Sequence, residues 1–238
     1  MVKSEFYMMI NKKIGRGELI WMPIYYLRSS LIPMAKIGTD IDHAAALLRE
    51  GKLVGIPTET VYGLAGNAFD ERALLKIFEV KRRPATVPLI AQTSSLEKAK
   101  GFVEHFSKEA LLLAEKFWPG ALTLVMKKSA LMPDLMTSGG DTVGIRIPNH
   151  AMTLQLLSRL DFPLAVPSAN IHGQKSPMTA EEVNEQIGDQ IEYILDGGTC
   201  AVGFESTIVS FKDGLPVILR QGALSKENIE STVNNTIN

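Results

Sequence analysis

The chain is poor in cysteine and in net charge, and these two scarcities exclude several classes of protein. Its 238 residues contain one cysteine, Cys200, which rules out an internal disulfide and zinc or redox sites of the CxxC type. The 25 Lys and Arg residues nearly balance the 26 Asp and Glu residues, and the formal net charge is −1. A generally basic nucleic-acid coat and an acidic disordered tail are therefore both disfavoured. Any anion-binding site must be built from a local cluster of cations.

Long hydrophobic runs are also missing. None reaches the roughly 18 residues of a membrane-spanning helix. The nearest candidate, residues 19–27, follows basic residues as in a signal peptide, but Pro23 interrupts it and no small-residue cleavage site follows. We therefore interpret residues 1–33 as an appendage, with Met34 as the functional start. Together with the scarcity of cysteine, this predicts a cytoplasmic protein without a membrane contact.

The motifs of several well-known catalytic sites are absent. There is no GxxxxGK[ST] phosphate loop, no GxGxxG after a predicted strand, no HExxH and no GxSxG. The four histidines, at positions 43, 105, 150 and 172, lie far apart and lack the spacing of metal ligands. We therefore expect no metal held by the protein's own side chains.

Helical and strand patterns alternate from residue 38 onward, which is typical of an α/β domain with a mixed sheet. The late strand patterns follow one another closely, and this spacing favours antiparallel pairing. We predict one domain over residues 38–225, an appendage over residues 1–37 and a C-terminal helix or tail over residues 226–238. Strand patterns occupy residues 53–57, 88–92, 121–128, 142–148, 163–168, 191–195, 206–211 and 216–220, and helical patterns occupy residues 39–51, 70–80, 151–160 and 179–188, with a last one from about residue 225.

Residues that favour helix N-caps precede three of these helical patterns. Thr39 and Asp70 each stand just before a run of apolar residues at helical spacing. Thr179 is followed three residues later by Glu182, which is the spacing of a capping box. We expect each of the three to begin a helix.

Cations stand at the ends of predicted elements, and each has two readings. Lys81, Arg82 and Arg83 follow a helical pattern, where cations either complement the helix macrodipole or hold an anion. Composition alone favours the macrodipole. Arg146 lies on the polar face of its predicted strand and Arg220 at the end of another. Each of these two arginines could bind an anion or extend its side chain into water. For either one taken alone, the second interpretation is favoured.

A turn-rich loop, residues 167–177, directly follows a buried type of strand. Ligands bind at strand ends in α/β sheets, and the hydroxyl and amide groups of Ser168, Asn170 and Ser176 could read a ribose, a base edge or a phosphate. A plain connection with Asx and Ser turns would have the same composition. Ser206 has a similar place at the start of a later strand.

Seven segments, taken in order, resemble the YrdC-type threonylcarbamoyl-AMP synthase family in its short, single-domain form. The similarity covers residues 38–225. The family's paired signature, K-x-R and later S-x-N, appears at residues 81–83 and 168–170. Each tripeptide alone is weak, whereas the ordered set is specific. The segments are PTETVYGLAGNAF, IFEVKRRPATVPLI, FWPGALTLVM, VGIRIP, VPSANIHGQKSP, GFESTIVS and ILRQGAL.

The resemblance implies a twisted mixed β-sheet with flanking helices around a large, concave, locally positive cavity. It also implies the nucleotidyl transfer of an L-threonylcarbamoyladenylate synthase, in which L-threonine, bicarbonate or CO2, and ATP yield threonylcarbamoyl-AMP and pyrophosphate. The product would pass to the transferase machinery that makes threonylcarbamoyladenosine in tRNA, and a contact with tRNA or double-stranded RNA is implied. Mg²⁺ would accompany ATP, held mainly by the phosphates.

The resemblance also assigns roles to residues. Attack of threonine carbamate on the α-phosphorus brings two anions together, and Lys81 and Arg83 would be catalytic because fixed cations lower that repulsion. Arg146 would clamp the amino-acid carboxylate. ATP would be held by Lys81, Arg83, Val87, Thr142, Ser168, Asn170, Ser176 and Arg220, and L-threonine by Thr60, Gln92, Arg146, Val166 and Ser206.

Two positions depart from the family pattern. Gln92 stands where histidine is common, and glutamine hydrogen-bonds without carrying a proton or positive charge. The threonine affinity or its pH response is expected to differ accordingly. Ser210 stands where an aspartate is frequent.

Two other functions compete with the enzyme. One is an RNA-binding module whose concave surface grips phosphates, which the balanced charge and the lack of interleaved basic and aromatic residues disfavour. The other is a hydrolase using Ser168 and His172, whose spacing in a glycine-containing loop does not ensure a nucleophile–base contact.

Overall fold

The computed structural model describes residues 7–9, 21–23 and 34–234. Contacts divide the chain into two compact units, Met1–Met34 and Ala35–Asn238. In the first unit, β1 (Tyr7–Met9) pairs antiparallel with β2 (Trp21–Pro23). The interpretation of residues 1–33 as an appendage falls mostly outside the described residues. Among the helices of the described segments, none has the length and apolarity to cross a bilayer.

A ten-stranded mixed sheet is the framework of the second unit, in the strand order β12-β11-β7-β8-β6-β9-β5-β4-β10-β3. Its strands are β3 (Lys36–Gly38), β4 (Val54–Ile56), β5 (Gly63–Asn67), β6 (Ile90–Gln92), β7 (Leu122–Lys127), β8 (Thr142–Arg146), β9 (Leu164–Ala165), β10 (Tyr193–Leu195), β11 (Thr207–Lys212) and β12 (Leu215–Arg220). The helices are α2 (Ile41–Arg49), α3 (Glu71–Lys81), α4 (Leu96–Lys100), α5 (Lys108–Phe117), α6 (Ala151–Ser158), α7 (Ala180–Ile187) and α8 (Lys226–Asn234), with a 3-10 turn, η1 (Asp134–Thr137).

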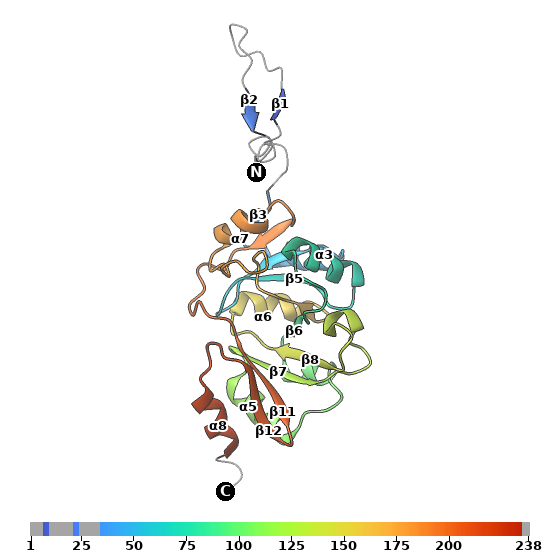
Figure 1. The fold of residues 1–238 in the computed structure, drawn as a ribbon, viewed down its shortest axis with the longest axis vertical. Helices are drawn as coiled ribbons and strands as arrows, with labels where there is room; N and C mark the ends of the chain where they lie inside the picture. Colours follow the sequence, from blue (N-terminus) through green and yellow to red (C-terminus); the bar gives the residue numbers. More distant parts are fainter. Residues whose placement is uncertain (1–6, 10–20, 24–33, 235–238) are drawn as a thin grey trace, which may run out of the picture. The chain divides into compact units, whose positions relative to one another are not determined.

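The predicted α/β class with a mixed sheet is confirmed. Antiparallel pairing of the late strands holds for β11 and β12, whereas β10 pairs parallel with both β3 and β4. The predicted domain boundary at residues 37 and 38 falls inside β3, which forms one edge of the sheet. In Figure 1, β3, α3 and α7 lie at one end of the unit, and β11, β12 and α8 lie at the other.

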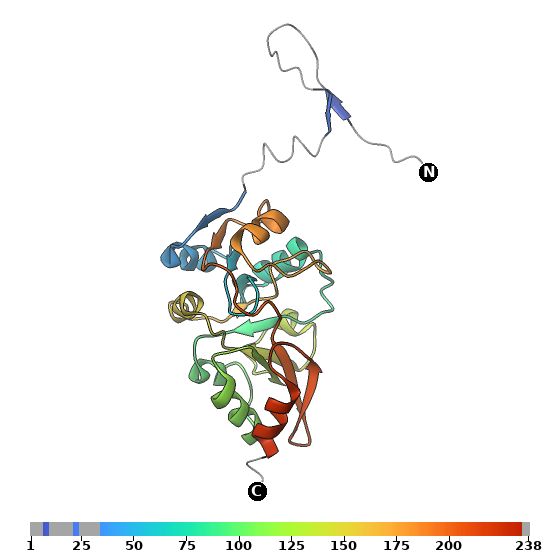
Figure 2. The same ribbon diagram turned by 90° about the vertical axis from the view of Figure 1, so that its left-hand side faces the viewer.

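At the β3 end, the strands are buried on both faces. Ile194 of β10 belongs to a core that includes Val183 and Ile187 of α7, whereas its neighbours Tyr193 and Leu195 belong to a second core with residues of α2 and α6. This alternation is the period of two of a strand between two helical layers. Figure 2 shows α2 and α3 on opposite sides of the strands at this end.

At the other end, the sheet is covered by helices on one face. Leu122 and Leu124 of β7, with Val143 and Ile145 of β8, join the core that includes residues of α5 and α8. The intervening residues of both strands face the opposite way and line a pocket. A sheet face without a helical layer is therefore what makes room for the site.

The helix starts agree with two of the three predicted caps. The side chain of Asp70 accepts from the Arg72 N–H at 2.9 Å, and Thr179 accepts from the Glu182 N–H at 3.2 Å. The Glu182 carboxylate in turn accepts a hydrogen bond from the Met178 N–H, at 2.6 Å. Both caps are confirmed.

The prediction of Thr39 as a cap is wrong, because the cap is Asp40. Its carboxylate accepts from the His43 N–H at 2.9 Å, and its own N–H donates to the Tyr193 hydroxyl at 3.0 Å. The contact with β10 holds Asp40 in the extended N-cap conformation. The N-cap therefore lies one residue later than the local pattern indicates, and the helix begins at Ile41.

We expect Asp40→Ala to lower the free energy of unfolding by about 1 kcal/mol, the usual loss for an N-cap. Thr39→Ala is the matched control and should have no measurable effect, since Thr39 is exposed and makes no cap bond. Chemical denaturation of both variants measures the difference. A larger loss for Thr39→Ala would contradict the assignment of the cap.

Candidate active site

A pocket of about 710 Å³ lies on the open face of the sheet. Its floor is made by β6, β7, β8 and β11, and its walls by the end of α3 and by the loops after β4 and β9. The structure brings nearly all the predicted site residues together here, and Thr60 is the exception. Those that line the pocket are Lys81, Arg83, Val87, Gln92, Thr142, Arg146, Val166, Ser168, Asn170, Ser176, Ser206 and Arg220.

The strand periodicity explains why Arg146 faces the pocket. Val143 and Ile145 point into the core, so Thr142, Gly144 and Arg146 point to the open side. The predicted facing of Arg146 is confirmed. The guanidinium is nonetheless almost fully buried, at 5% relative exposure.

The end of α3 sorts the three consecutive cations. Lys81 is the last helical residue, and Arg82 follows in the left-handed conformation with φ of 50°. The turn leaves Arg82 exposed, Arg83 partly buried and Lys81 buried at 1% exposure. Two of the three cations therefore line the pocket, which favours the anion-binding reading for these two.

Lys81 holds the wall of the pocket together. Its Nζ donates to the backbone carbonyl of Ser168 and, at 2.7 Å, to that of Asn170, while the Lys81 carbonyl accepts from the His172 N–H at 2.8 Å. Burial, and to a smaller extent the charge of Arg83, lower the pKa of Lys81 to about 7, and Glu205 acts in the opposite direction.

The loop after β9 is fixed by its own polar groups. The Asn170 amide donates to the carbonyls of Ile171 and Gln174, at 2.9 and 2.7 Å. Gly63 opposite has no side chain, and a Cβ there would lie 2.3 Å from a methyl group of Val166. The Asn170 amide thus stabilises its own loop, and Ser168 and Asn170 still line the pocket.

Arg83 and Arg220 add two cations from other segments. Arg83 donates to the backbone carbonyl of Pro88 at 2.8 Å, and burial lowers its pKa. Arg220 forms an ion pair with Glu205 and donates to the Ser206 carbonyl at 2.8 Å. Guanidinium groups keep their charge despite burial, so both remain cations at neutral pH.

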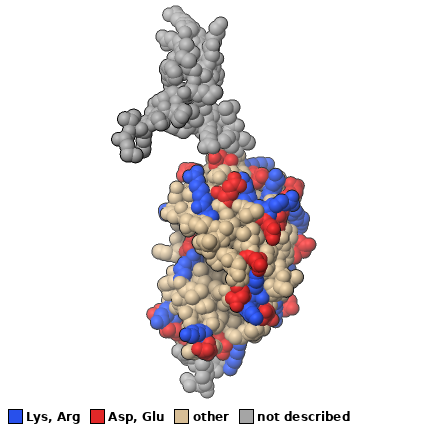
Figure 3. Space-filling model, turned by 45° about the vertical axis from the view of Figure 1, so that its right-hand side comes forward, with Lys and Arg blue, Asp and Glu red and all other residues tan. Residues whose placement is uncertain are grey.

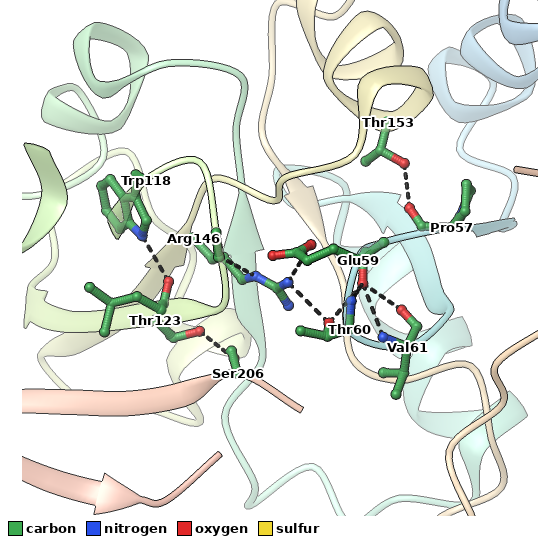
Figure 4. Close-up of polar contacts among 12 residues, drawn as sticks. Pro57, Glu59, Thr60, Val61, Trp118, Thr123, Arg146, Thr153 and Ser206 are labelled. Atoms are coloured by element: carbon green, nitrogen blue, oxygen red, sulfur yellow. Dashed lines mark hydrogen bonds and ion pairs between the residues drawn. The ribbon is translucent and has the colours of Figure 1, made fainter. Parts of the chain in front are cut away.

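Arg146 is held by three groups, drawn in Figure 4. Its Nε donates to the Gly120 carbonyl at 3.1 Å, and its Nη2 donates to the Thr60 hydroxyl at 3.0 Å. Nη2 also lies 2.8 Å from Oε2 of Glu59. Thr60 is fully buried and does not line the pocket, and its hydroxyl contacts Arg146, which does.

Three uncharged side chains complete the floor. Gln92 lies beside Arg146 in the sheet register, and its buried Oε1 accepts no hydrogen bond from the described residues. The Ser206 and Thr123 hydroxyls are hydrogen-bonded at 2.8 Å. An unpartnered acceptor beside a guanidinium suits a ligand that carries both an N–H donor and a carboxylate.

Sequence reasoning missed two carboxylates, Glu59 and Glu205. Glu205 lines the pocket, where it accepts from the Ser176 hydroxyl at 3.2 Å and neutralises part of the charge of Arg220. Glu59 lies beside Arg146 outside the pocket lining. Glu59 directly precedes Thr60, and Glu205 directly precedes Ser206, two residues that the sequence analysis singled out. An acidic residue beside a predicted ligand-binding residue was the available signal for both.

The site offers little for a metal ion by itself. In the part of the chain that the structure describes, no three His, Cys, Asp or Glu side chains are grouped as metal ligands. Glu205 is the one acid lining the pocket there. The donor set fits a Mg²⁺ ion that takes most of its ligands from phosphates and water.

Comparisons with known proteins give a consistent result. The model of the Sua5/YciO/YrdC family, described as telomere recombination, matches residues 46–222. The threonylcarbamoyl-AMP synthase of Pyrococcus abyssi is 47% identical over 80% of this chain, and that of Bacillus subtilis is 44% identical over 81%. The chain spans 56% of the length of each.

Solved structures agree with these relatives. The crystal structure of P. abyssi Sua5 complexed with L-threonine superposes with a TM-score of 0.80 at 44% identity, over 84% of this chain and 61% of that one. By the family model and by these relatives, the chain belongs to the Sua5/YciO/YrdC family.

Proposed function

We propose that this chain is an L-threonylcarbamoyladenylate synthase. It would convert L-threonine, bicarbonate or CO2, and ATP into threonylcarbamoyl-AMP and pyrophosphate. The observation that carries the proposal is the convergence of Lys81, Arg83, Arg146 and Arg220, from three separate segments, on one pocket. The names of the relatives and the threonine complex of P. abyssi Sua5 support the choice of substrates.

The pocket suits the two anions of this reaction. Lys81, Arg83 and Arg220 would face the phosphates of ATP, while Arg146 would hold the threonine carboxylate on the other side. The carbamate oxygen attacks the α-phosphorus, a new O–P bond forms, and the bond to the β-phosphate breaks, so that pyrophosphate leaves. Fixed cations reduce the repulsion between the carbamate and the phosphates and stabilise the developing charge.

Enclosure contributes to the chemistry as much as charge does. A free carbamate readily reverts to CO2 and amine, so it must be held beside ATP and away from water. The buried floor, with Gln92, Ser206 and Arg146 each at most 5% exposed, provides such an environment. Mg²⁺ bound to the ATP phosphates would offset part of their charge, with Glu205 as the nearest acid.

The wider setting belongs to the same proposal. The product would be consumed by a tRNA threonylcarbamoyl transferase, in the cytoplasm where ATP and tRNA meet. A contact with tRNA would have to use local charges, because Lys and Arg are interspersed with Asp and Glu on the face drawn in Figure 3. The hydrolase reading has no support in the described residues, since no hydrogen bond joins Ser168 to His172 in them.

Pyrophosphate release tests the activity directly. With ATP, bicarbonate and L-threonine, the protein should release pyrophosphate, and omitting threonine should abolish most of it. The matched control replaces threonine with other amino acids, which also measures the effect of Gln92 on selectivity. An RNA-binding module would release none and would bind RNA with a steep salt dependence.

Two substitutions separate the proposed roles. We expect Arg146→Ala to raise the KM for threonine roughly 10- to 100-fold, the effect of losing charge-assisted hydrogen bonds to a carboxylate. Lys81→Ala should instead lower kcat roughly 100-fold at saturating ATP, because it removes charge from the transition state. Thermal unfolding of both variants controls for misfolding. Wild-type kinetics in both would refute the assigned roles.

The lowered pKa of Lys81 predicts a pH dependence. The lysine is charged below pH about 7 and loses its proton above it, so kcat/KM for ATP should fall as the pH rises through that value. Lys81→Arg keeps its charge over this range and should lack the falling limb, even if its overall rate is lower. If kcat/KM fell equally with rising pH in the wild type and in Lys81→Arg, the titrating group would be a residue other than Lys81.

A further inference from the structure

Glu59 is a buried acid that the proposed mechanism does not use. Its side chain is 14% exposed, and Oε2 lies 2.8 Å from Nη2 of Arg146. Both carboxylate oxygens are buried, and the ion pair with Arg146 is the one polar contact of the carboxylate among the described residues. A buried carboxylate in this state is costly unless its charge is compensated. Arg146 is the compensating group.

Arg146 has two hydrogen bonds besides its contact with Glu59. Hydrogen bonds to the Gly120 carbonyl and the Thr60 hydroxyl already fix two of the three guanidinium nitrogens. Nη1 has no hydrogen-bond partner among the described residues, and Arg146 lines the pocket. Glu59 therefore supplies charge to a guanidinium that other groups hold in place.

The carboxylate itself sits on a fixed stretch of backbone. The Glu59 carbonyl accepts from the Val202 N–H at 3.0 Å, and the Thr60 carbonyl accepts from the Gly203 N–H at 2.9 Å. On the other side, Thr58 Oγ1 accepts from the N–H groups of Thr60 and Val61, at 3.1 and 3.2 Å. The backbone of Glu59 is thus fixed beside Arg146 by hydrogen bonds from a second loop, residues 202–203.

We propose that Glu59 is the resident counter-ion of Arg146, which neutralises the guanidinium while the pocket is empty and thereby weakens its hold on the carboxylate of the amino acid. The choice of ligand rests on the proposed function. Glu59 does not line the pocket, so it acts through Arg146 rather than on the substrate. The reaction product keeps the same carboxylate, so a weaker interaction of Arg146 with that carboxylate also allows the product to dissociate.

Two physical effects decide the expected sign. Without Glu59, the buried cation is uncompensated in the empty protein, which destabilises the fold. A bound carboxylate then supplies the missing charge, so ligand binding recovers more free energy than in the wild type. Arg220 and Glu205 also act on Arg146, with opposite sign and less strongly than Glu59.

Glu59→Gln tests this, because it removes the charge and keeps the shape. We expect a lower Tm without ligand, a larger rise of Tm on adding L-threonine, and a Kd for threonine about tenfold lower by calorimetry, within the usual range of coupling between sites. The KM for ATP should stay unchanged. Glu182→Gln is the matched control: it removes the charge of an acid outside the pocket lining, its amide oxygen can still accept from the Met178 N–H, and it should leave threonine binding unchanged.

A double-mutant cycle tests the counter-ion role without any assay of activity. Glu59→Gln should destabilise the wild type strongly but stabilise an Arg146→Met background, where the Glu59 carboxylate would be a buried charge without its partner. Equal destabilisation in both backgrounds would overturn the ion-pair role. An unchanged or weaker threonine affinity in Glu59→Gln would overturn the moderated grip.

These outcomes differ from a failure of the proposed function. If the wild type released no pyrophosphate and bound no threonine, the enzyme assignment and the moderated grip would both fall, while the cycle would still decide whether Glu59 compensates Arg146. If Glu59→Gln alone did not fold, the double variant with Arg146→Met should fold, and its failure to do so would count against the counter-ion.

Discussion

The buried ammonium of Lys81 is the contact on which the site depends. It closes the end of α3 onto the loop after β9 through the carbonyls of Ser168 and Asn170. Removing a cation from water is costly, and the two carbonyl oxygens of the loop recover part of that cost. The same bonds set the distance between two walls of the pocket. Lys81 therefore both holds the pocket walls together and supplies a positive charge to the pocket. Its pKa consequently affects the geometry of the pocket as well as its charge.

The pocket is more balanced in charge than a simple anion hole. Four cations line it, yet Arg220 is paired with Glu205, and Arg146 with Glu59 behind the lining. Every one of these cations already has acceptors within the protein. Such prior engagement lowers the cost of holding positive charges together without a ligand and keeps their geometry fixed before a ligand arrives. Because these cations already have partners in the protein, binding of an anion releases less free energy than it would with unpaired cations.

The position of the site follows from the helical layers. Where helices cover both faces, as around β10, the sheet is fully packed. Where α5 and α8 cover one face only, alternate residues of β7 and β8 face the open side, and Thr142, Gly144 and Arg146 become the floor. A period of two thus converts one uncovered sheet face into a row of ligand-facing positions.

The sequence by itself determined the class of fold, the two caps at Asp70 and Thr179, the facing of Arg146 and the residues that gather at the pocket, because these follow from local periodicity and from ordered motifs. Only the tertiary structure decided that Asp40 begins α2, that Thr60 lies behind Arg146, and that Glu59 and Glu205 accompany the cations. Each of these depends on a partner distant in the chain, namely Tyr193, Arg146 or Arg220, and local pattern carries no information about such contacts.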